Sequence, residues 1–272
     1  MSRALELAQQ LAETHNLPDE GLLYLLDHRE GTAAFLQEQA QAACQQWYGR
    51  QVFIRGLLEF TNFCKNNCYY CGIRKGNPEA QRYRLSQEQI LACCQTGYEL
   101  GFRTFVLQGG EDPWFTDERL CALVRAIKER WPDCAVTLSV GERSRESYRL
   151  LKEAGADRYL LRHETATPGH YARLHPPELS LARRLECLQD LKDLGYQVGA
   201  GFMVGSPYQT QEDLVRDLRF LKEFQPHMVG IGPFLSQKDA PFREFPNGSG
   251  ELTLYLLSLI RLLLPKVLLP AT

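Results

Sequence analysis

The sequence lacks the features of several large protein classes. Its 272 residues carry 31 basic and 33 acidic side chains, and a net charge of −2 gives no electrostatic footprint for nucleic acid. The most apolar segment, residues 252–269, is interrupted by Arg261, Pro265 and Lys266, which a membrane span would not carry at its centre. The first twenty residues show no signal-peptide pattern. We therefore expect a protein that binds neither nucleic acid nor membranes.

Other absences narrow the choice of chemistry. No Gly-x-Gly-x-x-Gly follows the first predicted strand, which disfavours a dinucleotide-binding fold. No Ser/His/Asp arrangement is evident, so no catalytic side chain is assigned. The nine cysteines are an odd number without the paired pattern of a secreted disulfide scaffold, which favours the reducing cytoplasm.

Three of the cysteines form a pattern that is typical of an iron–sulfur site. Cys64, Cys68 and Cys71 have the spacing C-x3-C-x2-C, with Tyr70 directly before the last cysteine. Three thiolates from one loop can bind three irons of a 4Fe–4S cluster and leave the fourth iron without a protein ligand. Such an open iron can bind a small molecule, so the spacing predicts chemistry rather than electron storage.

A structural zinc site is the alternative interpretation of the same cysteines. Zinc usually takes four ligands, often as two spaced pairs, and the sequence has no second C-x2-C. Cys93 and Cys94 are adjacent in an apolar helical stretch, and four further cysteines are isolated and resemble small core residues: Cys44, Cys121, Cys134 and Cys187. The open cluster is therefore the preferred hypothesis.

Short apolar runs alternate with helical stretches after residue 50, which is typical of parallel βα units. Before that point, three helices are predicted. The first is an amphipathic helix at the start of the chain, the second covers residues 19–29 and the third covers residues 32–48. Seven strands are expected, at residues 52–60, 104–108, 135–140, 158–162, 198–204, 228–231 and 267–269. We predict an α/β fold of the TIM-type (βα)8 barrel class, incomplete with about seven strands, and with an N-terminal helical extension.

Polar residues cluster after the predicted strand ends. The cysteine loop follows the first strand, and residues 109–112 (Gly-Gly-Glu-Asp) follow the second. Ser139 and Glu142 lie at the third strand, and His163 and Glu164 follow the fourth. In a barrel these positions meet at one mouth, where active sites form.

On these residues the chain resembles the radical S-adenosylmethionine (SAM) enzymes, and within them the HydE family of iron–iron hydrogenase maturases. Methylornithine synthase and biotin synthase are related families. The similarity extends over essentially the whole chain from about residue 50. It rests on the blocks EFTNFCKNNCYYCGIR (59–74), QRYRLS (81–86), VLQGGEDP (106–113), AGADRYLLRHETA (154–166), GAGFMVG (199–205) and MVGIGPF (228–234).

The resemblance implies a set of cofactor-binding residues. Cys64, Cys68 and Cys71 would ligate the cluster, and Tyr70 would lie beside the adenine of SAM. The SAM-binding positions that the resemblance implies are Gly109, Gly110, Glu111, Ser139, Glu164 and Arg184. Chemically, Arg184 could donate a forked pair of hydrogen bonds to the SAM carboxylate, and Glu164 could accept from the ribose hydroxyls.

Each of these positions also has a structural interpretation. Gly109 to Glu111 could form an ordinary turn at a strand end, Arg184 could be a solvated helix charge, and Glu164 could cap the following loop. Four further residues, which lie on or near strand ends, are candidates for lining a substrate cavity: Arg55, Thr137, Arg162 and Met228.

The resemblance also gives an expectation about domains. Residues 1–49 would be the helical extension and residues 50–272 the radical SAM barrel. The resembled family continues beyond the final segment LLPAT with an eighth strand, so the chain is expected to be truncated before that strand, with an open edge at residues 267–269. It has no ligands for the second cluster that occurs in some members of the family.

The expected activity is reductive cleavage of SAM to a 5′-deoxyadenosyl radical at the 4Fe–4S cluster, in maturation of the iron–iron hydrogenase cofactor. The substrate would be a small molecule or iron complex, and the partners would be other hydrogenase maturases and an electron donor such as flavodoxin or ferredoxin. The alternatives are a radical mutase or synthase of the methylornithine synthase type, acting on an amino-acid-like substrate, and a non-catalytic metal-binding module.

Overall fold

Parallel strands form at the apolar runs of the second part of the chain. The computed structural model describes residues 2–270, and in them six strands make one parallel sheet in the order β1-β2-β3-β4-β5-β7, while β6 pairs with β8. The strands are β1 (Gly56–Thr61), β2 (Thr104–Gly109), β3 (Ala135–Ser139), β4 (Arg158–Leu160), β5 (Gln197–Ala200), β6 (Met203–Val204), β7 (Met228–Val229) and β8 (Gly232–Pro233).

Most helices begin at a capping side chain that accepts a hydrogen bond from the first turn. Ser86 and Thr210 form capping boxes with Gln89 and Asp213. The helices are α1 (Arg3–Thr14), α2 (Asp19–Asp27), α3 (Ala33–Tyr48), α4 (Gln87–Glu99), α5 (Asp117–Arg130), α6 (Arg145–Glu153), α7 (Pro168–Leu174), α8 (Leu181–Asp193), α9 (Gln211–Phe224) and α10 (Gly250–Leu263), with a 3-10 turn at η1 (Arg29–Gly31).

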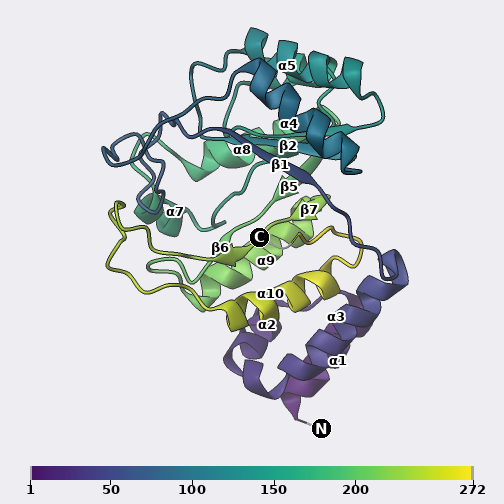
Figure 1. Ribbon diagram of the computed structural model, residues 1–272. Coiled ribbons are helices and arrows are strands. Elements are labelled where there is room, and N and C mark those ends of the chain that lie inside the picture. Colours follow the sequence, from purple (N-terminus) through teal and green to yellow (C-terminus); the bar gives the residue numbers. More distant parts are fainter. Residues whose placement is uncertain (1, 271–272) are drawn as a thin grey trace.

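The sheet is curved, and helices cover its outer face (Figure 1). We call the inner side of the curved sheet the lumen. Side chains alternate along each strand, so that one set packs under the helices and the other faces the lumen. Leu107, Leu138 and Tyr159 belong to the buried apolar set. Thr137 and Arg158 are register partners on β3 and β4 and belong to the other set. The predicted class, a parallel α/β barrel with about seven strand positions, is confirmed.

Five predicted strands differ from those observed by more than one residue, and two of them are only shorter: 158–162 is Arg158–Leu160 and 228–231 is Met228–Val229. The first predicted strand begins at Gly56 rather than residue 52, because residues 52–55 have no pairing partner and Val52 is 85% exposed. The strand predicted at 198–204 is divided at Gly201, where a Cβ atom would lie 1.8 Å from the Gly230 carbonyl oxygen. The strand predicted at 267–269 is a single bridge between Leu268 and Met228.

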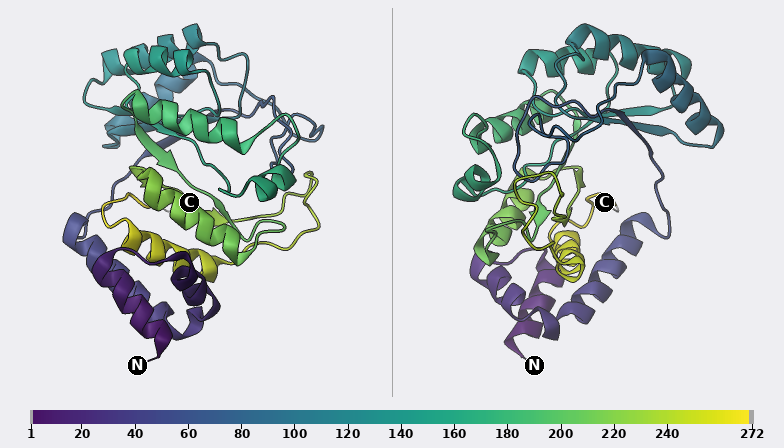
Figure 2. Two further views of the ribbon diagram at one scale, coloured as in Figure 1. Left: turned by 180° about the vertical axis from the view of Figure 1, so that it is seen from behind. Right: turned by 60° about the vertical axis from the view of Figure 1, so that its left-hand side comes forward.

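The first three helices pack against the last helices of the chain. The Thr32 and Tyr255 hydroxyls are hydrogen-bonded at 2.9 Å, and Arg219 on α9 donates to the Leu17 carbonyl at 2.6 Å. The segment that joins α3 to β1 runs along one side of the molecule (Figure 2). The boundary predicted at residue 49 stays a prediction. No helix between residues 2 and 270 combines the length and the apolarity needed to cross a membrane.

Candidate functional site

The three cysteines lie in the cluster loop, which we define as residues 62–84, between β1 and α4. Cys64, Cys68 and Cys71 are all partly buried. Backbone hydrogen bonds fold the loop on itself, from Cys71 N–H to the Cys68 carbonyl and from Lys75 N–H to the Asn66 carbonyl. The loop therefore presents the three thiols from one tight segment.

Arg82 holds the cluster loop together from within, a role that the sequence analysis missed. Its guanidinium donates to four main-chain carbonyls, those of Asn62 at 2.5 Å, Ile73 at 2.8 Å, Arg74 at 2.6 Å and Asn77 at 3.4 Å. Carbonyl groups in an irregular loop lack the hydrogen bonds that a helix or sheet would provide, and here the Arg82 side chain provides them. Arg82 lies inside the block QRYRLS, but no spacing rule distinguishes it from its arginine neighbour Arg84.

The thiols are close enough to influence one another. Burial, and then the neighbouring Cys71 and Cys64 thiols, raise the pKa of Cys68 to about 12. Among residues 2–270, no three His, Cys, Asp or Glu side chains converge as the ligands of one metal ion. A 4Fe–4S cluster does not need that convergence, because each thiolate binds a different iron. Three soft thiolates on one loop fit such a cluster, and the assignment stays a prediction.

Gly110 allows the cluster loop to pack against the end of β2. A Cβ atom there would lie 2.2 Å from the Phe63 carbonyl oxygen and 2.8 Å from Cys64 Cβ. At Gly109 a Cβ atom would lie 2.6 Å from Thr61 Cγ2. The two glycines are therefore explained by the close approach of the cysteine segment, whatever ligand their carbonyls contact.

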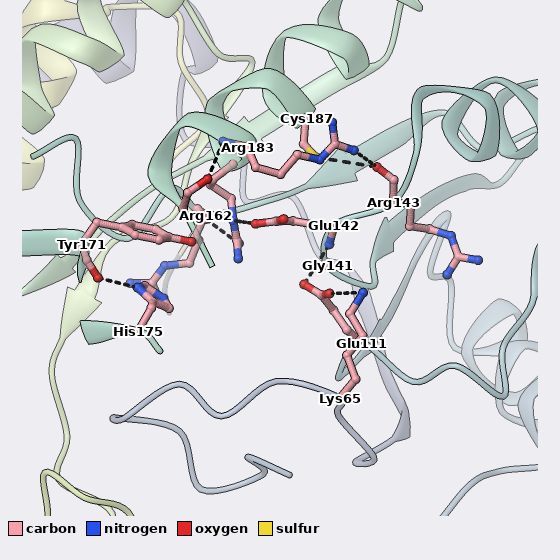
Figure 3. A network of polar contacts seen from close by, with 12 residues as sticks. Lys65, Glu111, Gly141, Glu142, Arg143, Arg162, Tyr171, His175, Arg183 and Cys187 are labelled. Carbon is pink, nitrogen blue, oxygen red and sulfur yellow. Dashed lines mark hydrogen bonds and ion pairs between the residues drawn. The ribbon is translucent and has the colours of Figure 1, made fainter. Parts of the chain in front are cut away.

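Glu111 connects the cluster loop to the loop after β3 (Figure 3). Its Oε2 pairs with Lys65 Nζ at 3.2 Å, and its Oε1 accepts from the Glu142 N–H at 2.9 Å. Gly141 has a φ of +75°, and a Cβ atom there would lie 2.0 Å from Glu111 Cγ. The Glu111 carboxylate is thus engaged by the protein itself, and its predicted contact with SAM stays a prediction.

Glu164 lies at the mouth in a strained backbone conformation. Its φ is +66°, in the left-handed region that few non-glycine residues adopt. Its N–H donates to the Gly201 carbonyl at 3.1 Å. The carboxylate lies 3.3 Å from Arg162 Nη2, yet neither Glu164 Oε2 nor Arg162 Nη2 makes a hydrogen bond among the described residues. Buried polar atoms in this state fit a site that receives a polar ligand.

A fully buried pair, His163 and Asp217, supports the backbone of Glu164. His163 Nδ1 accepts from the Gly201 N–H at 3.3 Å, so Nε2 carries the proton and donates to Asp217 Oδ1 at 3.2 Å. Asp217 also accepts from the Ala166 N–H at 2.5 Å. Burial lowers the pKa of His163 to about 3 and raises the pKa of Asp217 well above its usual range. The sequence analysis did not find Asp217, which lies on α9.

Arg184 on α8 is buried and reaches the lumen, so the alternative of a solvated helix charge is wrong. Its Nε donates to Glu142 Oε1 at 2.6 Å and its Nη1 to the Arg162 carbonyl at 3.0 Å. Burial acts to lower the pKa of Arg184, but Tyr171 and Glu142 raise it above its ordinary value. The guanidinium is therefore charged.

Tyr70 is held by His175, another residue that the sequence analysis missed. The His175 Nδ1 donates to the Tyr171 carbonyl at 3.0 Å, so its Nε2 accepts from the Tyr70 hydroxyl at 3.1 Å. Burial lowers the pKa of His175 to about 4. The hydrogen bond to His175 therefore orients the Tyr70 ring within the cluster loop. Its contact with adenine stays a prediction.

The four predicted cavity residues include two that contact each other across the lumen. Arg55 Nη1 donates to Met228 Sδ. Burial lowers the pKa of Arg55, as does the positive charge of Arg158. Arg158 was not among the predicted residues, although it is two positions before Leu160 and four before Arg162 and so shares their face of the strand.

Thr137 and Ser139 occupy alternate positions on β3. The Thr137 hydroxyl is buried without a hydrogen-bond partner among residues 2–270. Ser139 lies one register pair from the end of β2, opposite Gln108. Both positions therefore belong to the lumen face of the sheet, Ser139 nearer the mouth. Their roles stay predictions.

Residues 58–221 match the radical SAM superfamily, and the chain therefore belongs to this superfamily of enzymes. The predicted resemblance is confirmed. The chain is 48% identical over 228 residues to the [FeFe] hydrogenase maturase subunit HydE of Thermotoga maritima, which covers 84% of this chain and 65% of that protein. It is 30% identical over 270 residues to the 3-methylornithine synthase of Methanosarcina barkeri, covering 98% of this chain and 76% of that protein.

Solved structures have the same fold. The structure of methylornithine synthase (PylB) has a TM-score of 0.89 at 30% identity, covering 97% of this chain and 78% of that chain. The structure of HydG, a maturase of the [FeFe]-hydrogenase, has a TM-score of 0.81 at 23% identity and covers 98% and 62%. This second likeness concerns the fold alone.

Proposed function

We propose that the protein is a radical SAM enzyme that holds a 4Fe–4S cluster at Cys64, Cys68 and Cys71 and binds SAM across the mouth of the barrel. One observation supports this proposal most strongly. A loop with three free thiols lies at the same barrel as charged side chains and buried polar atoms that have no hydrogen-bond partner among the described residues. When bound and reduced, the cluster supplies the electron that cleaves SAM to methionine and a 5′-deoxyadenosyl radical.

The chain's own residues bind and orient SAM in this proposal. Arg184 pairs with the carboxylate, Glu164 accepts from the ribose hydroxyls, and Tyr70 contacts the adenine. Ser139 and the strand-end segment from Gly109 to Glu111 contact the methionine part. Arg184 lies on α8 and Glu164 lies in the segment after β4. In this proposal the distance between them matches the distance between the carboxylate and the ribose of SAM.

The lumen contains the reactive species and selects the substrate. A primary radical attacks any accessible C–H bond, so the surrounding wall must exclude water and competing groups. Three arginines belong to the strands that enclose this lumen: Arg55 directly before β1, Arg158 at the start of β4 and Arg162 just after β4. Their positive charge favours an anionic substrate, and an iron-bound cysteine complex that carries carbon monoxide and cyanide fits that requirement.

We further propose that the reaction contributes to maturation of the iron–iron hydrogenase cofactor. The 48% identity to HydE supports this assignment. Other hydrogenase maturases would supply and receive the iron complexes, and flavodoxin or ferredoxin would supply electrons. The free thiols suit the reducing cytoplasm. The helices of residues 1–49 would form an extension to the barrel.

The test is maturation of apo-hydrogenase in vitro with the other maturases present and HydE replaced by this protein. Because the match covers 65% of the HydE relative, the assay also uses a version completed with the parts of that relative that lie outside the match. Hydrogen evolution should appear with the wild type and disappear with Cys68→Ala. Cleavage of SAM without any active hydrogenase would contradict the maturation role.

Methylornithine synthesis is the second candidate function. The structural similarity to PylB over 97% of this chain favours it. Incubation with lysine, SAM and a reductant, followed by mass spectrometry, distinguishes the two. Formation of 3-methylornithine would establish the second candidate, whereas hydrogenase maturation without any lysine conversion would exclude it.

A further inference from the structure

Glu142 forms a buried ion pair with Arg184 that no motif of the sequence indicates. Glu142 follows β3 in the chain, and its Oε1 lies 2.6 Å from Arg184 Nε on α8. The two side chains are 12% and 9% exposed, so solvent screens the pair weakly. The proposed SAM contacts leave this carboxylate without an assignment.

The pair uses one edge of the guanidinium and leaves another unused. Glu142 accepts from Nε, and the Arg162 carbonyl accepts from Nη1. Nη2 makes no hydrogen bond with any residue between 2 and 270, and it is not fully buried. An arginine presents five donors in a rigid plane, so fixing Nε and Nη1 also fixes the direction of Nη2.

Glu142 is itself anchored to the cluster loop (Figure 3). Its N–H donates to Glu111 Oε1, and Glu111 Oε2 pairs with Lys65, the residue after Cys64. Gly141 gives the Glu111 side chain the space that a Cβ atom would fill. A continuous series of contacts therefore connects the first cysteine of the loop to Arg184.

We propose that Glu142 is a positioning residue: it holds Arg184 so that the Nη2 edge meets the carboxylate of SAM, and Glu111 sets its place relative to the cluster loop. This inference rests on the proposed binding of SAM at Arg184. It assigns Glu142 no contact with SAM. The iron-bound end of SAM and its carboxylate contact would then be aligned by the same three side chains, Lys65, Glu111 and Glu142.

The opposite role for Glu142 is that of a competitor, which would occupy the carboxylate site until SAM displaces it. A competitor should accept from the edge that the ligand uses, whereas Glu142 accepts from Nε and leaves Nη2 unbonded. Its backbone is also fixed by Glu111. The two roles predict opposite effects of removing the charge.

The experiment measures binding of SAM and of decarboxylated SAM to the reconstituted holoprotein by calorimetry, with iron content measured on each sample. Glu142→Gln keeps the shape of the side chain and removes its charge. We expect it to weaken SAM binding about tenfold to thirtyfold, in the range of one charge-assisted hydrogen bond. It should weaken decarboxylated SAM less than twofold. The matched control, Glu186→Gln, removes an exposed carboxylate that pairs with the neighbouring Arg183 and should change neither.

A double variant tests whether Glu142 acts through Arg184. Glu142→Gln combined with Arg184→Lys should bind SAM no more weakly than Arg184→Lys alone. Equal weakening of both ligands by Glu142→Gln, unchanged SAM binding, or tighter SAM binding would each overturn the proposal. The first outcome would indicate a structural role and the last a competitor.

The failure of the underlying function has a different signature. If Arg184 does not bind the carboxylate, Arg184→Lys will weaken SAM and decarboxylated SAM equally in the wild-type background. That result would remove the proposed SAM contact before Glu142 is considered. Discrimination by Arg184 together with no effect of Glu142→Gln would refute the positioning role alone.

Discussion

The cluster loop and the opposite side of the mouth are built in different ways. The cluster loop is one continuous segment, closed by backbone hydrogen bonds and by Arg82, which donates to four main-chain carbonyls. The opposite side combines Glu142, Glu164 and Arg184 from three separate elements, connected by charged side chains. The first region depends on local sequence, whereas the second depends on the fold.

The two regions differ in whether they need a ligand in order to form. The polar groups around Arg184 are already paired, so the protein organises them without a ligand. Burial raises the pKa of Cys68 and Cys71, which disfavours their thiolate forms. Iron would supply the charge that the thiolates lack. We therefore expect metal binding to depend on the loop alone and SAM binding to depend on the whole mouth.

The largest effect is expected when the thiols of the cluster loop are removed. Replacing Cys64, Cys68 and Cys71 together by Ala should abolish the cluster, because six other cysteines lie outside the loop. Anaerobic reconstitution followed by iron analysis and absorbance measures it. Cys93→Ala, which removes an exposed thiol on α4, is the control and should retain the cluster. Four irons per chain in the triple variant would show that the assignment is wrong.

A smaller change displaces the loop without touching a thiol. Gly110→Ala places a methyl group against the Phe63 carbonyl and Cys64 Cβ, so it should reduce iron content and lower the free energy of unfolding by about 1–3 kcal/mol. Gly169→Ala on α7 is the control, since nothing lies within 4 Å of its added Cβ. Urea unfolding and iron analysis give both quantities. Equal stability of the two variants would contradict the packing argument.

Substitutions on the opposite side of the mouth should weaken the binding of SAM and leave the iron content unchanged. Glu164→Ala and Arg184→Ala each remove a charged partner of the ligand, which costs about 1.5–3 kcal/mol and weakens SAM binding about tenfold to a hundredfold. Iron content should stay at the wild-type level. Arg183→Ala, on the same helix and half-exposed, is the control. Unchanged affinity in both variants would remove these residues from the site.

The smallest expected effect is a pH dependence of stability at the pair His163 and Asp217. The pKa of His163 falls to about 3 in the fold from 6.5, so below pH 6.5 the unfolded chain binds the extra proton and stability is lost as the pH falls. Asp217, with its pKa raised above 3.8, binds its extra proton in the fold, so its contribution to stability grows as the pH falls. The two contributions oppose each other over this window.

Asp217→Asn should expose the contribution of His163. Its loss of stability relative to the wild type should grow by up to about 1.4 kcal/mol per pH unit between pH 6.5 and pH 5. Urea unfolding at three pH values measures it, with Glu223→Gln, an exposed change on the same helix, as control. A constant difference would contradict the opposed titration. The other charged groups that act on the pair are Arg162, Glu164, His170, Arg184 and Asp213.

The same comparison explains what the sequence could predict. The cysteine triplet and the barrel class follow from spacing and periodicity, which are local properties. Arg184 and Glu164 were proposed only from the family resemblance. Glu142 could be placed at the third strand end but not paired with Arg184, and Asp217 could not be found at all, because their contacts span 42 and 54 positions of the chain.

Strand ends failed for a related reason. The apolar run at residues 198–204 predicts one strand, yet Gly201 must pass the Gly230 carbonyl, a contact between two different strands. Three of the four residues at 52–55 are apolar, but no neighbouring strand pairs with this segment. Local pattern specifies the tendency to form a strand, and only the neighbours determine where the strand begins and ends.

The packing of α1–α3 against α10 has a consequence for how the chain is made. His15 contacts the Leu262 carbonyl, Thr32 the Tyr255 hydroxyl and Tyr48 the Lys266 carbonyl, each across more than 200 positions of the chain. The first helices leave the ribosome long before their partner exists, so their apolar faces stay uncovered during most of synthesis. We expect these helices in stalled nascent chains to be cleaved by protease until α10 has emerged, and to become protected once it has.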